Sequence, residues 1–155
     1  MTGWAVVGIG AADRGDDGVG LLVAEGVREL APPELSVVAV ANPLDLLDVF
    51  DGYPGVVVVD AVRTGAAPGA VSMTVVGEDP LPTGSAAAGT HGMGVAEAVE
   101  LARALDRLPA RLVLIGVEVS DVGTGAGLSA PVAAAVDAAV GVVLAVATAL
   151  PEGSS

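Results

Sequence analysis

Residues 55–60 read Gly-Val-Val-Val-Val-Asp, four consecutive valines that end in an aspartate. A short, continuous run of β-branched residues predicts a strand that is buried on both faces, as in parallel sheets. Other apolar runs on either side predict further strands at 3–10, 36–41, 68–76 and 112–119. The run at 68–76 follows a Gly/Ala/Pro turn closely, which favours an edge strand for it.

Helical patterns separate these runs. Predicted helices span 18–30, 43–50 and 91–105, and a last helix opens at Ser129 and Pro131 by N-cap and first-turn preferences. The side chains expected to face inward are Val19, Leu22, Val23, Val27 and Leu30 in the first helix and Val95, Val99, Ala102 and Leu105 in the third. Strands that alternate with helices predict an α/β fold with a mostly parallel sheet and helices on both faces.

The composition is that of one globular domain, which we assign to residues 1–155. Hydrophobic residues make up 53% of the chain and charged residues 16%, so disorder is excluded. There is no cysteine, which excludes disulfides and thiolate chemistry. The N-terminus lacks the basic region of a signal peptide. The apolar stretch 131–151 contains Asp137, and we interpret it as a buried helix, not as a membrane span.

The charge is strongly negative. Nineteen acidic residues face six arginines, and the formal net charge is −13. Such a field repels nucleic-acid phosphates and anionic membrane surfaces, and it attracts a metal cation or a cationic segment of a partner.

Three acidic or imidazole positions are predicted to meet at one edge of the sheet, where the strands of open α/β folds end and ligands bind. The first predicted strand runs into Asp16-Asp17, the third ends at Asp60, and His91, the only histidine, begins the third long helix. Two carboxylates and an imidazole suit a borderline divalent cation with open positions. From the residues alone, a simpler interpretation also stands: helix capping by the aspartates, closure of a strand by Asp60, and a solvated histidine.

Two other kinds of site fit less well. Gly8-x-Gly10 after a strand is typical of dinucleotide binding, but Asp13 stands where the third glycine belongs. A P-loop is excluded because the chain has no lysine. A Ser–His–Asp triad lacks a Gly-x-Ser-x-Gly turn.

Four motifs in order resemble the hydrogenase maturation endopeptidases, which trim [NiFe]-hydrogenase large subunits. They are Gly8-Ile9-Gly10 with residues 14–20 (Arg-Gly-Asp-Asp-Gly-Val-Gly), residues 59–61 (Val-Asp-Ala) with Gly65 and Pro68-Gly69, residues 90–94 (Thr-His-Gly-Met-Gly) with Glu97, and residues 116–118 (Gly-Val-Glu) with Gly125-x-Gly127-Leu128-Ser129. The resemblance covers nearly the whole chain.

The resemblance implies a three-layer α/β/α sandwich with about five strands, and a cytoplasmic peptidase. Its partner is the hydrogenase large-subunit precursor, from which it removes a C-terminal peptide after nickel insertion. Asp17, Asp60 and His91 fall on the family's nickel-contacting and catalytic positions, and no organic cofactor is implied. The nickel is either bound by this chain or brought by the substrate. Asp16 orients the loop or shares the cation.

Two departures from the family pattern lie in loops where they affect the expected contacts with the substrate. Ala11 stands where the family usually has Asn, and Ala41-Asn42-Pro43 replaces a Gly/Thr-rich turn. Two further hypotheses therefore stay open: a nickel-sensing checkpoint or assembly protein that does not cut, and a small-molecule or nucleotide-binding α/β protein.

Overall fold

The computed structural model of the chain describes residues 3–10, 18–82, 84, 94–119 and 129–149. Within these ranges, five strands and four α-helices follow one another, with one 3-10 turn before the second helix. In chain order they are β1 (Trp4–Ile9), α1 (Val19–Leu30), β2 (Ser36–Val40), η2 (Pro43–Asp45), α2 (Leu46–Gly52), β3 (Gly55–Val62), β4 (Val71–Val75), α3 (Val95–Ala104), β5 (Arg111–Glu118) and α4 (Ala130–Ala149).

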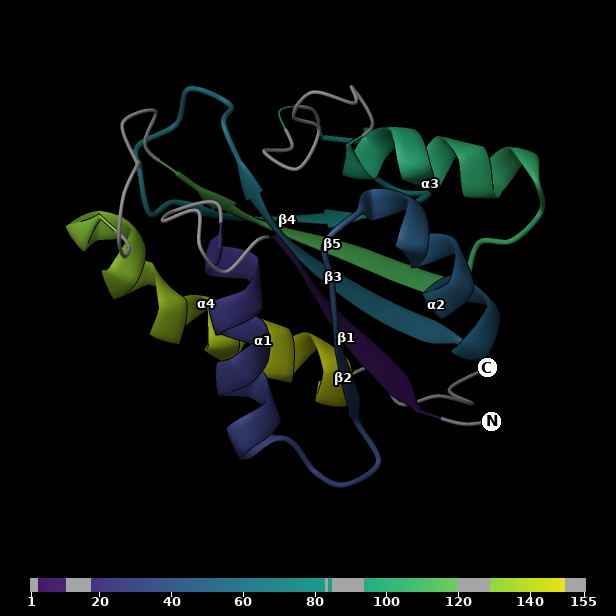
Figure 1. The fold of residues 1–155 in the computed structure, drawn as a ribbon, viewed down its shortest axis with the longest axis horizontal. Coiled ribbons are helices and arrows are strands. Elements are labelled where there is room, and N and C mark those ends of the chain that lie inside the picture. Colours follow the sequence, from purple (N-terminus) through teal and green to yellow (C-terminus); the bar gives the residue numbers. More distant parts are fainter. Residues whose placement is uncertain (1–2, 11–17, 83, 85–93, 120–128, 150–155) are drawn as a thin grey trace.

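The strands form one sheet in the order β2-β1-β3-β5-β4. Every neighbouring pair is parallel except β4 with β5, so β4 is antiparallel. It lies at the edge of the sheet, as its sequence predicts. Helices α1 and α4 lie on one face of the sheet, and α2 and α3 lie on the other (Figure 1). The prediction of a three-layer α/β/α sandwich with a mostly parallel five-stranded sheet is confirmed.

The valine run of β3 supplies both halves of the core. All eight residues of this strand are buried. Val57 and Val59 belong to the cluster under α1 and α4, whereas Val56 and Val58 belong to the cluster under α2 and α3. The strand continues for two residues beyond Asp60, so the prediction that it ends at Asp60 is wrong. Burial on both faces leaves no polar alternation to mark where such a strand stops.

Helix α1 approaches the sheet through small residues. A Cβ on Gly20 would lie 2.5 Å from the carbonyl oxygen of Ile9 and 2.7 Å from that of Val59, so only glycine fits there. Gly8 is similarly close to α1, where an added Cβ would meet Gly20 and Ala24. The first turn of α1 therefore lies directly on β1 and β3.

This close approach changes which side chains of the helices face inward. Gly20 and Ala24 are buried with Val19, Val23 and Val27, and Leu22 and Leu30 are 46% and 69% exposed. The prediction that these two leucines face the core is wrong, because the small residues mark the contact face of α1.

Helix α3 also differs from its prediction at both ends. It begins at Val95, not at His91, and the Gly94 N–H donates to the Glu97 carboxylate at 2.9 Å. A buried face of Val95, Ala98, Val99 and Ala102 leaves Leu105 exposed beyond the last helical residue.

Helix α4 is half core and half surface. Its inner side packs Val132, Ala139 and Val143 into the cluster with α1, and Ala134 and Ala138 on its outer side are exposed. About a third of the segment Ala130–Thr148 is buried, so the interpretation of this stretch as a buried helix holds for its inner side only. By length and composition alone this segment could also cross a membrane, a test that core helices pass as well.

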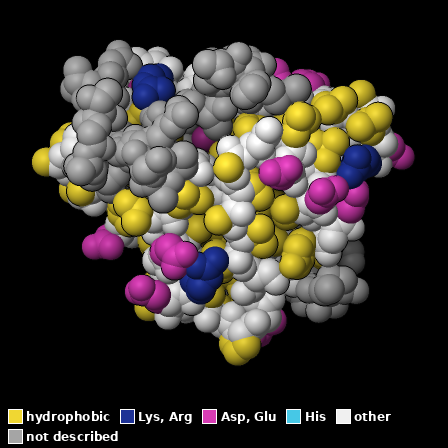
Figure 2. Space-filling view, in the orientation of Figure 1, with side chains coloured by type: hydrophobic (Ala, Val, Ile, Leu, Met, Phe, Trp, Pro, Cys, Tyr) yellow, Lys and Arg dark blue, Asp and Glu magenta, His cyan; other side chains and the backbone are white. Residues whose placement is uncertain are grey.

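Acidic side chains are spread over the face shown in Figure 2 and do not gather in one patch. Some are paired with arginine. Arg107 donates to both carboxylate oxygens of Asp51, at 2.6 and 3.2 Å, and lies 3.6 Å from Asp48. These hydrogen bonds lower the pKa of Asp51 and raise the pKa of Arg107, and they link α2 to the segment after α3.

We expect Gly20→Ala and Gly141→Ala to change stability in opposite directions. The Gly20 variant forces a methyl group against backbone atoms that cannot rotate away, which should cost about 1–3 kcal/mol or more. Gly141 lies exposed on α4 with no atom within 4 Å of an added Cβ, so alanine should stabilise the helix by roughly 0.5–1 kcal/mol. Urea unfolding of both variants measures the difference, and equal effects would contradict the close contact.

The ion pair of Asp51 should contribute to stability above the unfolded pKa of the carboxyl, and the contribution should be lost as pH falls through the lower folded pKa. Arg107→Gln should return the pKa of Asp51 toward its ordinary value near 3.8. NMR titration of the Asp51 carboxyl measures the shift. An unchanged titration curve in the variant would show that Arg107 is not its cause.

Candidate functional site

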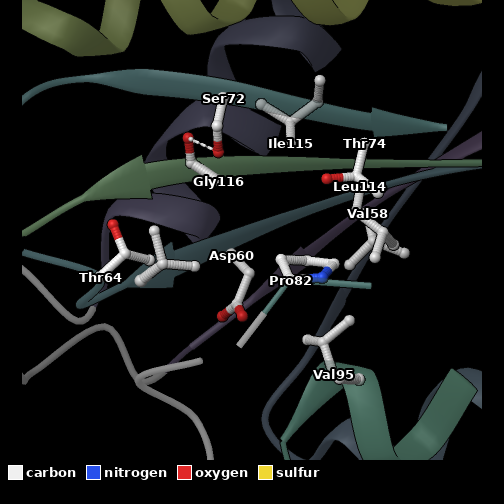
Figure 3. A pocket seen from close by; sticks show the side chains of 12 residues that line it. Val58, Asp60, Thr64, Ser72, Thr74, Pro82, Val95, Leu114, Ile115 and Gly116 are labelled. Atoms are coloured by element: carbon white, nitrogen blue, oxygen red, sulfur yellow. Dashed lines mark hydrogen bonds between the residues drawn. The ribbon is translucent and has the colours of Figure 1, made fainter. Parts of the chain in front are cut away.

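Asp60 is a carboxylate within an otherwise apolar strand. It is 5% exposed and pairs with Gly116 of β5. Because residues alternate along a strand, Asp60 shares the α2/α3 side of the sheet with Val58 and Val62. Figure 3 shows its carboxylate beside Pro82, with Val95 of α3 below it. These residues line a cavity over the carboxyl-terminal parts of β3 and β5.

The cavity lies beside the point where the connections of the sheet change direction. From β1 the chain goes to β2 on one side, and β3 then pairs with the other side of β1. Open α/β sheets bind ligands at the carboxyl ends of the strands at such a switch point. The contact of Gly20 with the carbonyls of Ile9 and Val59 brings the start of α1 to the switch point from the opposite face of the sheet, against the backbone of the residue before Asp60.

The segment that follows the edge strand β4 also reaches Asp60. The Arg63 N–H donates to the Gly84 carbonyl at 2.8 Å, which holds the chain after Pro82 against the end of β3. Val95 and Ala96, in the first turn of α3, line the cavity opposite. The described residues on both sides of 85–93 are therefore close to β3.

Glu118 fixes the turn that follows β3. Its carboxylate accepts hydrogen bonds from the Thr64 N–H at 2.8 Å, the Thr64 hydroxyl at 2.7 Å and the Gly65 N–H at 3.2 Å. The side chain is 4% exposed. Its backbone holds the next part of the same connection, because the Gly69 N–H donates to the Glu118 carbonyl at 2.8 Å.

Sequence analysis missed the role of Glu118. The simpler interpretation of the sequence has Asp60 close its strand by accepting bonds from loop N–H groups. In the structure, Glu118 accepts bonds of this kind. A signal was available, since Glu118 is the one charged side chain near the end of the apolar run 112–119. A buried acid in such a position needs nearby N–H donors.

Of the predicted site residues, the structure describes Asp60. Asp17, His91, Asp16 and Ala11 lie outside the described residues, as does the glycine-rich loop 123–127. Within the described ranges no group of three His, Cys, Asp or Glu side chains could hold a metal ion. The ligand set of Asp17, Asp60 and His91 therefore stays a prediction.

Comparison with known protein families identifies the family of this chain. Residues 28–146 match the family model described as hydrogenase maturation protease. The chain belongs to the hydrogenase maturation protease family. The resemblance seen in its motifs is thereby confirmed, and so is its class as a peptidase.

Solved structures of this family have the same fold. A [NiFe] hydrogenase maturation protease, HybD, from Thermococcus kodakarensis is 26% identical, with a TM-score of 0.72 and coverage of 94% of this chain and 99% of that one. A second protease from Thermococcus kodakarensis, HycI, is 25% identical, with a TM-score of 0.69 and coverage of 95% and 93%. The hydrogenase maturating endopeptidase HybD from E. coli is 20% identical, with a TM-score of 0.75 and 99% coverage of both chains. Comparison with curated protein sequences gives no match.

We expect Glu118→Gln to destabilise this maturation protease by about 1–3 kcal/mol, because the amide offers one acceptor oxygen to three donors and leaves buried N–H groups unpaired. Glu100→Gln is the matched control. Glu100 is exposed and lies 3.6 Å from Arg103, so its loss should change stability by less than about 0.5 kcal/mol. Thermal and urea unfolding compare the two. Equal stability of both variants would show that Glu118 does not hold the turn.

Proposed function

We propose that this protease removes the C-terminal peptide from the large-subunit precursor of a [NiFe] hydrogenase after nickel has been inserted, and that it works in the cytoplasm. Family membership supports the reaction class. The names of the two Thermococcus proteins support hydrogenase maturation as the process in which it acts. The net charge of −13 favours encounter with a basic C-terminal segment.

We place the reaction at Asp60, Asp17 and His91, which makes the enzyme an aspartate-dependent peptidase. The observation that carries this assignment is the position of Asp60 in a cavity over the carboxyl-terminal part of β3, next to the switch point between β1 and β3. Asp17 directly precedes Gly18, the N-cap of α1, and the first turn of α1 lies on the carbonyl of Val59. His91 is four residues before Val95, which lines the same cavity as Asp60. The start of α1 thus lies against the backbone beside Asp60 from the opposite face of the sheet, and the start of α3 lies on the same face as the Asp60 side chain.

The residues fit the metal. Two carboxylates and one imidazole are suitable ligands for a divalent first-row cation and leave positions for a substrate group. Asp17, Asp60 and His91 would hold nickel where it would polarise a carbonyl or lower the pKa of a bound water. We assign nickel to the substrate, and the three side chains would contact it when the precursor docks. The apolar walls around Asp60 would exclude water from the carboxylate.

The test is cleavage of a nickel-loaded precursor, followed by mass spectrometry. The wild type should shorten it by one C-terminal peptide and leave the nickel-free precursor uncut. Asp60→Asn keeps the shape of the side chain and removes its charge, and it should slow cleavage by about 100-fold or more. His91→Ala should do the same.

Asp137→Asn is the matched control for Asp60→Asn, because Asp137 lies exposed on α4. It should cleave at the wild-type rate. Binding of the nickel-loaded precursor without shortening would replace the proposal by the nickel-sensing checkpoint. Cleavage by Asp60→Asn at the wild-type rate would overturn the site.

A further inference from the structure

The cavity beside Asp60 has a floor made by the absence of a side chain. Gly116 lies between Asp60 of β3 and Ser72 of β4 in one row across the sheet. A Cβ on Gly116 would lie 2.8 Å from the Ser72 hydroxyl oxygen and 3.2 Å from a methyl carbon of Val62. Any larger residue at position 116 would therefore press against Ser72 and Val62 at the floor of the cavity.

The walls of the cavity are mostly apolar and come from three directions. Val58 and Leu114 are buried at one end of it, and Val95 and Ala96 of α3 close it from the helix side. Two hydroxyls, from Ser72 and Thr74 of the edge strand, complete the wall on the β4 side (Figure 3). Ser72 is exposed, so this side of the cavity opens toward solvent.

The size and charge of the cavity restrict what can enter. The volume of the cavity is about 40 Å³. That is room for roughly three or four heavy atoms and too little for an aromatic ring or the full length of lysine or arginine. Among the described residues that line the cavity, Asp60 is the only charged one, and its carboxylate repels acidic groups.

We propose that this cavity is a specificity pocket that takes a small, uncharged side chain, such as that of alanine, valine or threonine, from one of the two residues that flank the cleaved bond. The inference rests on the proposed function, because the pocket shares Asp60 with the reaction site. A peptide side chain seated over Gly116 brings its own backbone next to the Asp60 carboxylate. Size selection is then built into the fold by Gly116 and Ala96.

The experiment uses precursors in which each flanking residue is changed in turn to Ala, Val, Phe, Lys or Glu. At one of the two positions the wild type should prefer Ala or Val over Phe, Lys and Glu by at least about 10-fold in kcat/KM. Ala96→Leu narrows the pocket from α3 and should lower kcat/KM for the Val precursor relative to the Ala precursor by about 10-fold or more. Thr74→Leu narrows it independently from β4 and should shift this ratio the same way.

Ala138→Leu is the matched control, since the same change on the exposed side of α4 leaves the pocket untouched. It should keep the wild-type preference. Equal cleavage of all five residues at both positions by the wild type would overturn the pocket and leave the peptidase standing. An equal loss for every substrate in both narrowed variants would also overturn it. Failure to cut the unaltered precursor would overturn the proposed function itself.

Discussion

The contact between the backbone of Gly20 and the carbonyl oxygens of Ile9 and Val59 is the constraint on which the site depends. Close packing of backbone on backbone is available only to glycine, because a Cβ would meet atoms that cannot rotate away. It seats the first turn of α1 at the junction of β1 and β3. The neighbouring residue along β3 is Asp60, so the same contact fixes the start of α1 relative to the one buried aspartate of the described chain.

The strand that carries Asp60 explains how a carboxylate is held in an apolar layer. β3 is buried along its whole length by valines that face both cores. Burying an acid costs free energy, and a fold keeps one there when it has partners or a task. Glu118 is the second buried acid of the described chain, and its carboxylate accepts hydrogen bonds from Thr64 and Gly65. Two acids with nearly equal burial thus lie in different surroundings, Asp60 beside a cavity and Glu118 against the turn after β3.

The alternation of apolar runs with helical patterns was sufficient to predict the order of the elements and helices on both faces of the sheet. The Gly/Ala/Pro turn before β4 predicted its edge position. The apolar runs could not predict where β3 stops, because a strand buried on both faces has no polar alternation. The prediction that the leucines of α1 face the core was wrong, because Leu22 and Leu30 are exposed while Gly20 and Ala24 face the sheet. The start of α3 at Val95 depends on the carboxylate of Glu97, a local bond that helical periodicity does not register. Of the site, the sequence predicted Asp60 and overlooked the cavity, which needs Gly116 and Ala96 brought together by the fold.

The central proposal is that Asp60, Asp17 and His91 contact the nickel that the precursor brings. Calorimetric titration of the nickel-loaded precursor near neutral pH, into the wild type and into Asp60→Asn, tests it most directly. Saturable binding by the wild type and much weaker binding by the variant are expected. Equally tight binding of the nickel-loaded precursor by Asp60→Asn would contradict the proposal.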